Sequence, residues 1–174
     1  MPSVMVDIET MGTKADCTVL TVGAVQFDPN IPGYMPSTLY LHLDIEEQLV
    51  LNRSVDADTM TWWATQDAVV RDEAFKLYGR VTLADALAAL SAFVLNADTV
   101  WSQGPTFDMI ILENLYTQMK MPIPWRYSRV RDSRTLFAVL GDQRPVDRSS
   151  AHNALSDCIY QAQGVQNCIA SITK

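Results

Sequence analysis

The first quarter of the chain alternates short apolar runs with turn residues. Residues 3–9, 18–27 and 38–44 are rich in Val, Leu, Thr and Tyr, which favour β-strands. Gly12 and the turn-rich segment 28–33 separate these runs. Because strands joined by short links usually pair as antiparallel neighbours, we expect a three-stranded antiparallel meander.

Apolar residues recur at helical spacing through most of the remaining chain. Residues 54–79 predict two short helices that end at Gly79. Several later apolar patterns follow a residue of a type that caps helices. The expected later helices are residues 83–96 after Thr82, 107–119 after Thr106, 133–140 after Asp132, and a last helix from about 151 to 172.

Two further strand-like segments lie between these helices, at residues 99–102 and near 125–130. The order is therefore three strands followed by alternating helices and strands. This order predicts an α/β fold, with a mixed five-stranded sheet of three antiparallel strands and two strands in βα units, flanked by helices. Because no linker or internal repeat interrupts the 174 residues, we expect a single domain over residues 1–174.

Composition agrees with a globular fold. Hydrophobic residues make up 48% of the chain and charged residues 19%. No apolar run is long enough to span a bilayer, and the first residues lack the basic region of a signal peptide. Cys17, Cys158 and Cys168 are odd in number and form no CxxC pair, so reduced, buried thiols are expected. We therefore expect a soluble, cytoplasmic protein without a membrane segment.

The formal net charge of −7 argues against nucleic-acid binding, but the charges are unevenly distributed. Residues 120–148 hold one lysine and six arginines against three aspartates, so this segment is basic and the remainder strongly acidic. Such a segment is often only a solvated surface. The alternative is contact with backbone phosphates, for which the candidates are Arg129, Arg131, Arg144 and Arg148.

Two carboxylates interrupt the first apolar run, at Asp7 and Glu9. Side chains alternate faces along a strand, so these two point the same way and repel each other. Further acids follow, at Asp108 in a helix N-terminus and at Asp157 close to His152. Carboxylates that converge on Mg²⁺ or Mn²⁺ no longer repel, and paired ions of this kind are a known arrangement for phosphodiester cleavage.

Each of these residues alone has a simpler explanation, as a surface group or a favourable charge at a helix N-terminus. Their joint order is more specific. The stretches DIET at 7–10, FD at 107–108 and HNALSD at 152–157 resemble the three exonuclease motifs of the DnaQ-like, DEDDh-type 3′–5′ exonucleases. That superfamily has the ribonuclease H-like fold, and the resemblance extends over residues 4–165.

The resemblance is closest to a phage and bacterial subgroup, on the segments TMTWWATQD and RDSRTL. This subgroup includes the exonuclease A type of T-even phages and a mycobacterial exoribonuclease, so a phage or prophage origin is expected. It contains enzymes that act on DNA and enzymes that act on RNA. The 2′-hydroxyl is what distinguishes the two substrates, and no motif in the chain reports on it.

The resemblance implies a phosphodiester hydrolase that releases 5′-mononucleotides from a single-stranded or frayed 3′ end of DNA or RNA. His152 is the implied general base, which activates the attacking water. Thr10 and Met11 follow the first motif, where the family places contacts to the terminal nucleotide. The implied ligands of two divalent cations, Mg²⁺ or Mn²⁺, are Asp7, Glu9, Asp108 and Asp157.

Trp62 and Trp63 are the remaining candidates for substrate contact. Consecutive helical residues differ by about 100° around the axis, so we expect one ring in the core and the other free to stack on a base. The alternative to an enzyme is an inactive nuclease-fold module that binds nucleic acid or protein. No ligand position is lost, which favours the enzyme, and the sequence leaves open whether it forms a homodimer.

Overall fold

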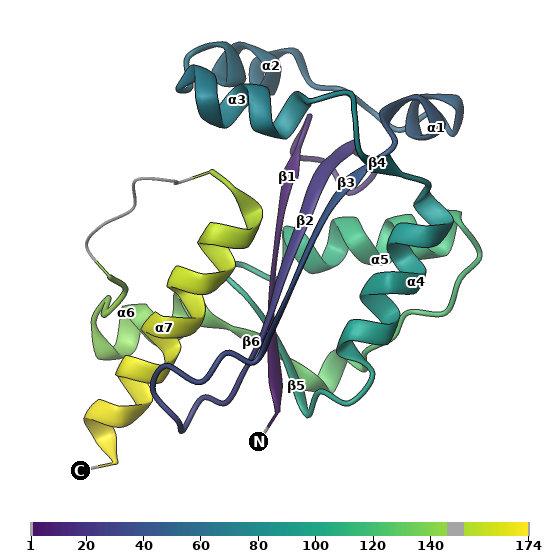
Figure 1. The fold of residues 1–174 in the computed structure, drawn as a ribbon. Helices are drawn as coiled ribbons and strands as arrows, with labels where there is room; N and C mark the ends of the chain where they lie inside the picture. Colours follow the sequence, from purple (N-terminus) through teal and green to yellow (C-terminus); the bar gives the residue numbers. More distant parts are fainter. Residues whose placement is uncertain (1, 146–151, 174) are drawn as a thin grey trace.

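A central mixed sheet organises the molecule (Figure 1), whose computed structural model describes residues 2–145 and 152–173. Within these residues six strands pair in the order β4-β3-β2-β1-β5-β6. Their bounds are β1 Ser3–Thr10, β2 Val19–Phe27, β3 Ser37–Leu43, β4 Arg80–Val81, β5 Thr99–Ser102 and β6 Val130–Asp132.

The strand directions confirm the expected meander. β1 pairs antiparallel with β2, and β2 pairs antiparallel with β3. On the other side β5 runs parallel to β1, and β6 runs parallel to β5. The predicted count of five strands was wrong, because β4 adds a sixth strand beside β3 and its two residues are too few to show a periodic pattern. The last strand also lies later than expected, because Tyr127–Arg129 forms a short 3₁₀ turn.

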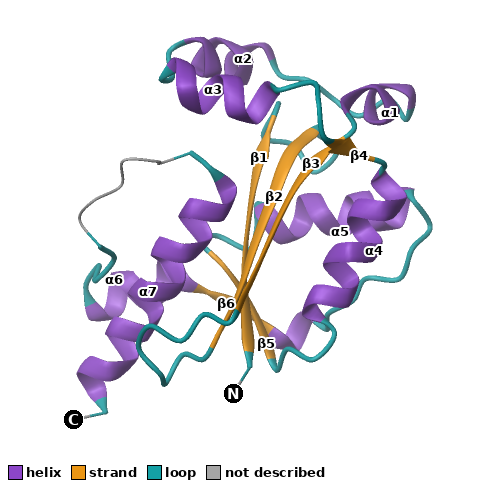
Figure 2. Cartoon of the chain, viewed as in Figure 1, coloured by secondary structure: helices purple, strands orange, loops and turns teal. Residues whose placement is uncertain are grey.

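Helices cover both faces of the sheet, which forms the orange central layer in Figure 2. α4 and α5 pack on one face, and α6 and α7 on the other, each with its own apolar core. α2 and α3 lie across the far end of β1, over a third cluster around Trp63. The helix bounds are α1 Ile45–Val50, α2 Ala57–Ala64, α3 Ala68–Phe75, α4 Leu83–Val94, α5 Asp108–Gln118, α6 Ser133–Leu140 and α7 Ala154–Ile172.

The predicted caps are confirmed at two of three helices. Thr82 and Asp132 accept hydrogen bonds from the first-turn amides of α4 and α6. The Thr106 prediction was wrong, because α5 begins one residue later and its N-cap position is Phe107, which makes no side-chain cap. α7 likewise begins at Ala154, where the side chain of Asn153 accepts from the amide of Ser156.

Gly23 brings α7 close to the sheet. This residue lies on β2 directly opposite Asp7 of β1. A Cβ atom at Gly23 would lie 2.3 Å from the carbonyl carbon of Ala154, so the first turn of α7 rests on bare strand backbone. The Cys158 thiol donates to the Gly23 carbonyl oxygen at 3.2 Å from the same helix. The start of α7 is thereby fixed beside the acidic end of β1.

The cysteine prediction is confirmed, since all three thiols are free and buried. Among the helices that the structure describes, none combines the length and the apolar character needed to cross a bilayer.

Candidate active site

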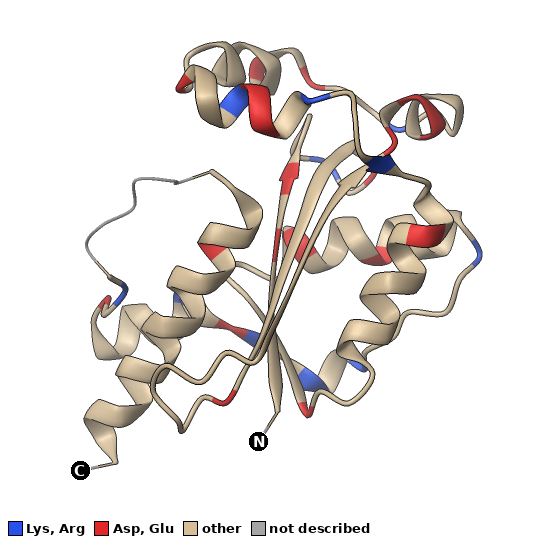
Figure 3. Ribbon diagram, viewed as in Figure 1, with Lys and Arg blue, Asp and Glu red and all other residues tan. Residues whose placement is uncertain are grey.

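Four carboxylates from three elements line one cavity of about 550 Å³. Two of them, Asp7 and Glu9, come from β1, and the acidic positions of β1, α5 and α7 are red on the ribbon in Figure 3. Asp108 is the first residue of α5, just beyond β5, and Asp157 lies in the first turn of α7. The sheet order explains the convergence, because β1 and β5 are parallel neighbours and α7 packs over β1 and β2.

Asp108 is the most enclosed of the four, with 4% of its surface exposed. Its carboxylate accepts hydrogen bonds from the Ile8 amide at 3.3 Å and from the Ser102 hydroxyl. Burial raises the pKa of Asp108 to about 6, while these two bonds and the nearby charge of Arg134 act in the opposite direction. The carboxylate therefore ties β1 to β5 and faces the cavity with a reduced tendency to ionise.

The two acids of β1 repel their neighbours more strongly. Burial, followed by the charges of Asp157 and Asp108, raises the pKa of Glu9 to about 8. Burial and the three other carboxylates raise the pKa of Asp7 well above its ordinary range, and a hydrogen bond from Gln161 offsets part of this. The repulsion between Asp7 and Glu9 that the sequence predicted is therefore present, and Arg134 and Arg144 are the positively charged residues that line the same cavity.

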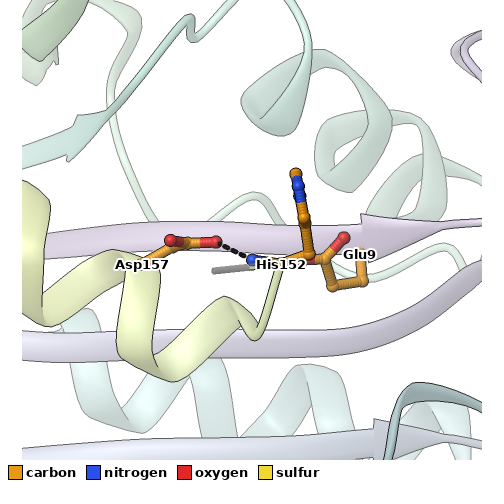
Figure 4. A group of neighbouring side chains, drawn as sticks. All are labelled: Glu9, His152 and Asp157. Carbon is orange, nitrogen blue, oxygen red and sulfur yellow. Dashed lines mark hydrogen bonds between the residues drawn. The ribbon is translucent and has the colours of Figure 1, made fainter. Parts of the chain in front are cut away.

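His152 lies beside the acids at the entry to α7 (Figure 4). Its backbone amide donates to Asp157 Oδ2 at 2.9 Å, and its φ of 65° is a left-handed conformation that is uncommon outside glycine. Ligand atoms of Glu9, His152 and Asp157 all lie within 4.8 Å of one another. The imidazole packs edge-on against the Trp62 ring, with 4.9 Å between the ring centroids.

Gln161 is a site residue that the sequence analysis missed. It lies four residues after Asp157 on α7, lines the acidic cavity and donates from Nε2 to Asp7 Oδ1 at 3.0 Å. The spacing was a usable signal, because residues i and i+4 share a helix face. Gln103 was also missed. It lines the cavity from the loop after β5, and its place there depends on tertiary structure.

A second, largely apolar cavity of about 390 Å³ adjoins the acidic one. The two cavities share the lining residues Ile8, Glu9 and Phe107. The apolar cavity continues over Thr10, Gly12 and α2. Of the two residues predicted after the first motif, Thr10 lines this cavity. Met11 does not line it and instead packs against the core cluster of Leu20, Trp63 and Ala74.

The two tryptophans divide as predicted. Trp63 is 1% exposed, and its indole donates to the Thr10 carbonyl oxygen at 2.9 Å. Trp62 is 39% exposed and reaches both the apolar cavity and the His152 ring. Trp63 therefore belongs to the core, and Trp62 is the tryptophan whose ring is exposed beside the apolar cavity.

The structure brings only part of the basic segment to the site. Arg144 and Arg134 line the acidic cavity. Arg129 does not, because it lies at the opposite end of the parallel strands, where its guanidinium donates to the Ala97 carbonyl oxygen. Arg131 also lies outside the cavity lining and is exposed, with its guanidinium bonded to the carbonyl oxygens of Ser128 and Val130. Arg148 falls outside the described residues.

Fold and sequence together place the chain among known enzymes. The mixed sheet with helices on both faces is the ribonuclease H-like fold of DnaQ-like, DEDDh-type exonucleases. The chain belongs to the Rv2179c-like 3′–5′ exoribonuclease domain family, whose model matches residues 2–169. The chain accordingly carries a 3′–5′ exonuclease domain. No curated protein matches the sequence significantly.

Three solved structures illustrate the similarity of fold. The zinc-bound complex of E. coli exonuclease I with single-stranded DNA has a TM-score of 0.68 and 14% identity, covering 95% of this chain and 40% of that one. The nuclease domain of 3′hExo, a DEDDh family member bound to rAMP, has a TM-score of 0.61 and 11% identity, covering 98% and 92%. Exonuclease X in complex with 5′-overhanging duplex DNA has a TM-score of 0.59 and 14% identity, covering 99% and 93%. The chain thus spans about two fifths of exonuclease I and nearly all of the other two.

Proposed function

We propose that the protein removes nucleotides one at a time from single-stranded or frayed 3′ ends, with two divalent cations, Mg²⁺ or Mn²⁺, at the acidic cavity. The observation that carries this proposal is the convergence of four carboxylates and one histidine on a single cavity. The proposed ligands of the cations are Asp7, Glu9, Asp108 and Asp157.

The donor set fits such cations. Mg²⁺ and Mn²⁺ prefer oxygen ligands, and the cavity offers four carboxylates against two arginines, Arg134 and Arg144. The raised pKa values of Asp7 and Glu9 have burial and mutual repulsion as their causes, and bound positive charge would offset both. When bound, the cations would supply the charge that activates a water molecule and stabilises the leaving 3′ oxygen.

His152 is the proposed general base. Its ring nitrogens lie within reach of the Glu9 and Asp157 carboxylates, where the attacking water would be held. The bond from the His152 amide to Asp157 fixes the backbone, and the edge contact with Trp62 restricts the ring. The imidazole would take a proton from the water as the bond to phosphorus forms.

The apolar cavity is the proposed binding site of the 3′-terminal nucleoside. It opens into the acidic cavity through the shared Glu9 and Phe107, so a base held there would place its phosphodiester among the carboxylates. Trp62 offers an exposed ring for stacking, and Thr10 lines the wall beside it. Arg144 and Arg134 also line the acidic cavity, and they are the proposed contacts for backbone phosphates.

The test is product release from matched RNA and DNA oligomers that carry a 5′ label. We expect a ladder that shortens by one nucleotide at a time, together with 5′-mononucleotides, only when Mg²⁺ or Mn²⁺ is present. The family description makes RNA the first substrate to try. Internal fragments as the first products would contradict exonucleolytic cleavage.

Two variants assign the roles within that assay. Asp7→Asn should abolish release while its fold persists, because the change removes one of several repelling charges. His152→Ala should lower turnover by about 10²–10⁴-fold and still bind Mn²⁺. Glu46→Gln, an exposed acid on α1, is the matched control and should act as the parent protein does. An inactive binding module would show the same null result for all four proteins.

A further inference from the structure

Gln161 occupies an unusual position beside the acid cluster. It shares a face of α7 with Asp157, is 5% exposed and lines the acidic cavity. Its Nε2 donates to Asp7 Oδ1 at 3.0 Å. The amide nitrogen is the atom that faces Asp7, so the amide oxygen faces away from it, and this orientation also suits an Asp7 carboxylate that is ionised because it binds a cation.

That amide oxygen is buried and has no hydrogen-bond partner among residues 2–145 and 152–173. Buried polar atoms are nearly always satisfied, so an acceptor without a partner on a residue that lines a cavity indicates a donor that arrives with a ligand. The carboxylates of the cavity cannot serve when they are ionised, because they have no proton to donate. A water molecule held with a cation would supply this donor.

We infer that Gln161 is a positioning residue for Asp7: its Nε2 holds Asp7 Oδ1, and its Oε1 accepts a hydrogen bond from a water molecule held with the cations. The hydrogen bond fixes Oδ1 of Asp7, so its second oxygen, Oδ2, is free to bind a cation. This inference rests on the proposed function. Groups that hold a metal ligand in this way typically change metal affinity by about 10–100-fold when they are removed.

α7 itself supplies the matched control. Gln166 is 1% exposed on the same helix, but its amide binds the loop after β2. It accepts from the Gly33 amide at 3.0 Å and donates to the carbonyl oxygens of Asp28 and Ile31. Removing this amide breaks four hydrogen bonds away from the acids, whereas the Gln161 amide makes one within the described part of the chain, so Gln166→Leu reports at least the structural effect of losing a buried glutamine.

The experiment is calorimetric titration with Mn²⁺, without nucleic acid, of the parent protein, Gln161→Leu and Gln166→Leu. We expect Mn²⁺ affinity to fall by about 10–100-fold in Gln161→Leu and to stay unchanged in Gln166→Leu, which should instead melt at a lower temperature. Gln161→Met, which keeps the length of the side chain without its amide, repeats the test if the leucine variant does not fold. Exonuclease activity of Gln161→Leu should recover when Mn²⁺ is raised in proportion.

Two results would overturn the inference. One is parental Mn²⁺ affinity in both Gln161 variants, and the other is absence of Mn²⁺ binding by the parent protein. The titration is also independent of the nuclease assay. If the parent protein binds Mn²⁺ but releases no nucleotides, the proposed function fails while a weaker Gln161 variant still supports the positioning role.

Discussion

Asp7 and Gly23 lie directly opposite each other across β1 and β2, and α7 crosses the sheet where Gly23 has no side chain. The carbonyl carbon of Ala154 would lie 2.3 Å from a Cβ atom at this position. The close approach brings Asp157 and Gln161 to the acids of β1. One glycine therefore links the packing of α7 to the assembly of the site.

Gly23→Ala should damage both stability and activity. The added methyl group cannot be accommodated without moving α7, and overpacking of this kind costs about 1–3 kcal/mol of unfolding free energy. Chemical denaturation gives that loss, and nucleotide release well below the melting temperature gives the effect on the site. Ser37→Ala on the exposed start of β3 is the control. Parental activity in a stably folded Gly23→Ala protein would show that the site does not need α7 to lie so close to the sheet.

Much of the fold was predictable, because its long elements carry clear periodic patterns. The antiparallel meander, the two short helices before Gly79 and the capped helices at Thr82 and Asp132 all follow from local sequence. The strand β4 could not be predicted from local sequence, because its two residues pair with β3 only through tertiary packing. Local sequence also cannot show that Gly23 is needed for the approach of a helix more than a hundred residues later.

The candidate site was predictable from motif order, and its surroundings were not. Order along the chain identified the acids and His152, which the structure brings to one cavity. The arginines were the weakest prediction, since sequence proximity placed Arg129 with Arg144 although they lie at different ends of the sheet. The role of Gln161 depends on a contact between β1 and α7, and no local pattern encodes that contact.

Stability of the metal-free protein should fall as pH rises. The pKa of Glu9 is raised from an ordinary value of 4.5 to about 8, and that of Asp108 from 3.8 to about 6. A raised pKa means that the folded state holds its proton more tightly. Its stabilising contribution is thus complete at low pH and is lost as pH rises through about 6 and then about 8. Chemical denaturation in EDTA between about pH 5 and pH 9 measures this trend.

Glu9→Gln is the control for that trend. It should flatten the upper part of the curve, because the group that loses its proton near pH 8 is gone. Saturating Mn²⁺ should make the stability of the parent protein rise with pH instead of fall, since ligands must be deprotonated to bind a cation. Metal-free stability that increases from neutral to alkaline pH would contradict the raised pKa values of Glu9 and Asp108.

Tyr40 should affect turnover through the entry to α7. Its hydroxyl accepts from Asn153 Nδ2 at 3.0 Å, and Asn153 also caps the helix and directly follows His152. Tyr40→Phe keeps the ring and removes this bond, which is worth about 1 kcal/mol. We expect kcat to fall by about fivefold while KM stays the same, because the change acts on the placement of the base.

A double-mutant cycle tests this link. Asn153→Ser retains a capping oxygen but cannot reach Tyr40, so it should lower kcat by a similar factor. The double variant should be no slower than either single variant, since both remove the same contact. Fully additive losses would show that Tyr40 acts on turnover by a route other than Asn153.

Arg144 and Arg129 provide a matched pair for the contact with backbone phosphates. Arg144 lines the acidic cavity, where it donates to Gln103 and pairs with Asp142 at 2.6 Å, whereas Arg129 lies at the other end of the sheet. Arg144→Ala should weaken binding of a single-stranded oligomer. The slope of log K for binding against log salt concentration should become shallower by about 0.7. Turnover at saturating substrate should change little, because the binding that is lost is equal in the ground state and the transition state.

Arg144→Lys should retain the slope, since it keeps the charge. Arg129→Ala should retain affinity and slope alike, and equal losses in the two alanine variants would show that the strand passes over both ends of the sheet.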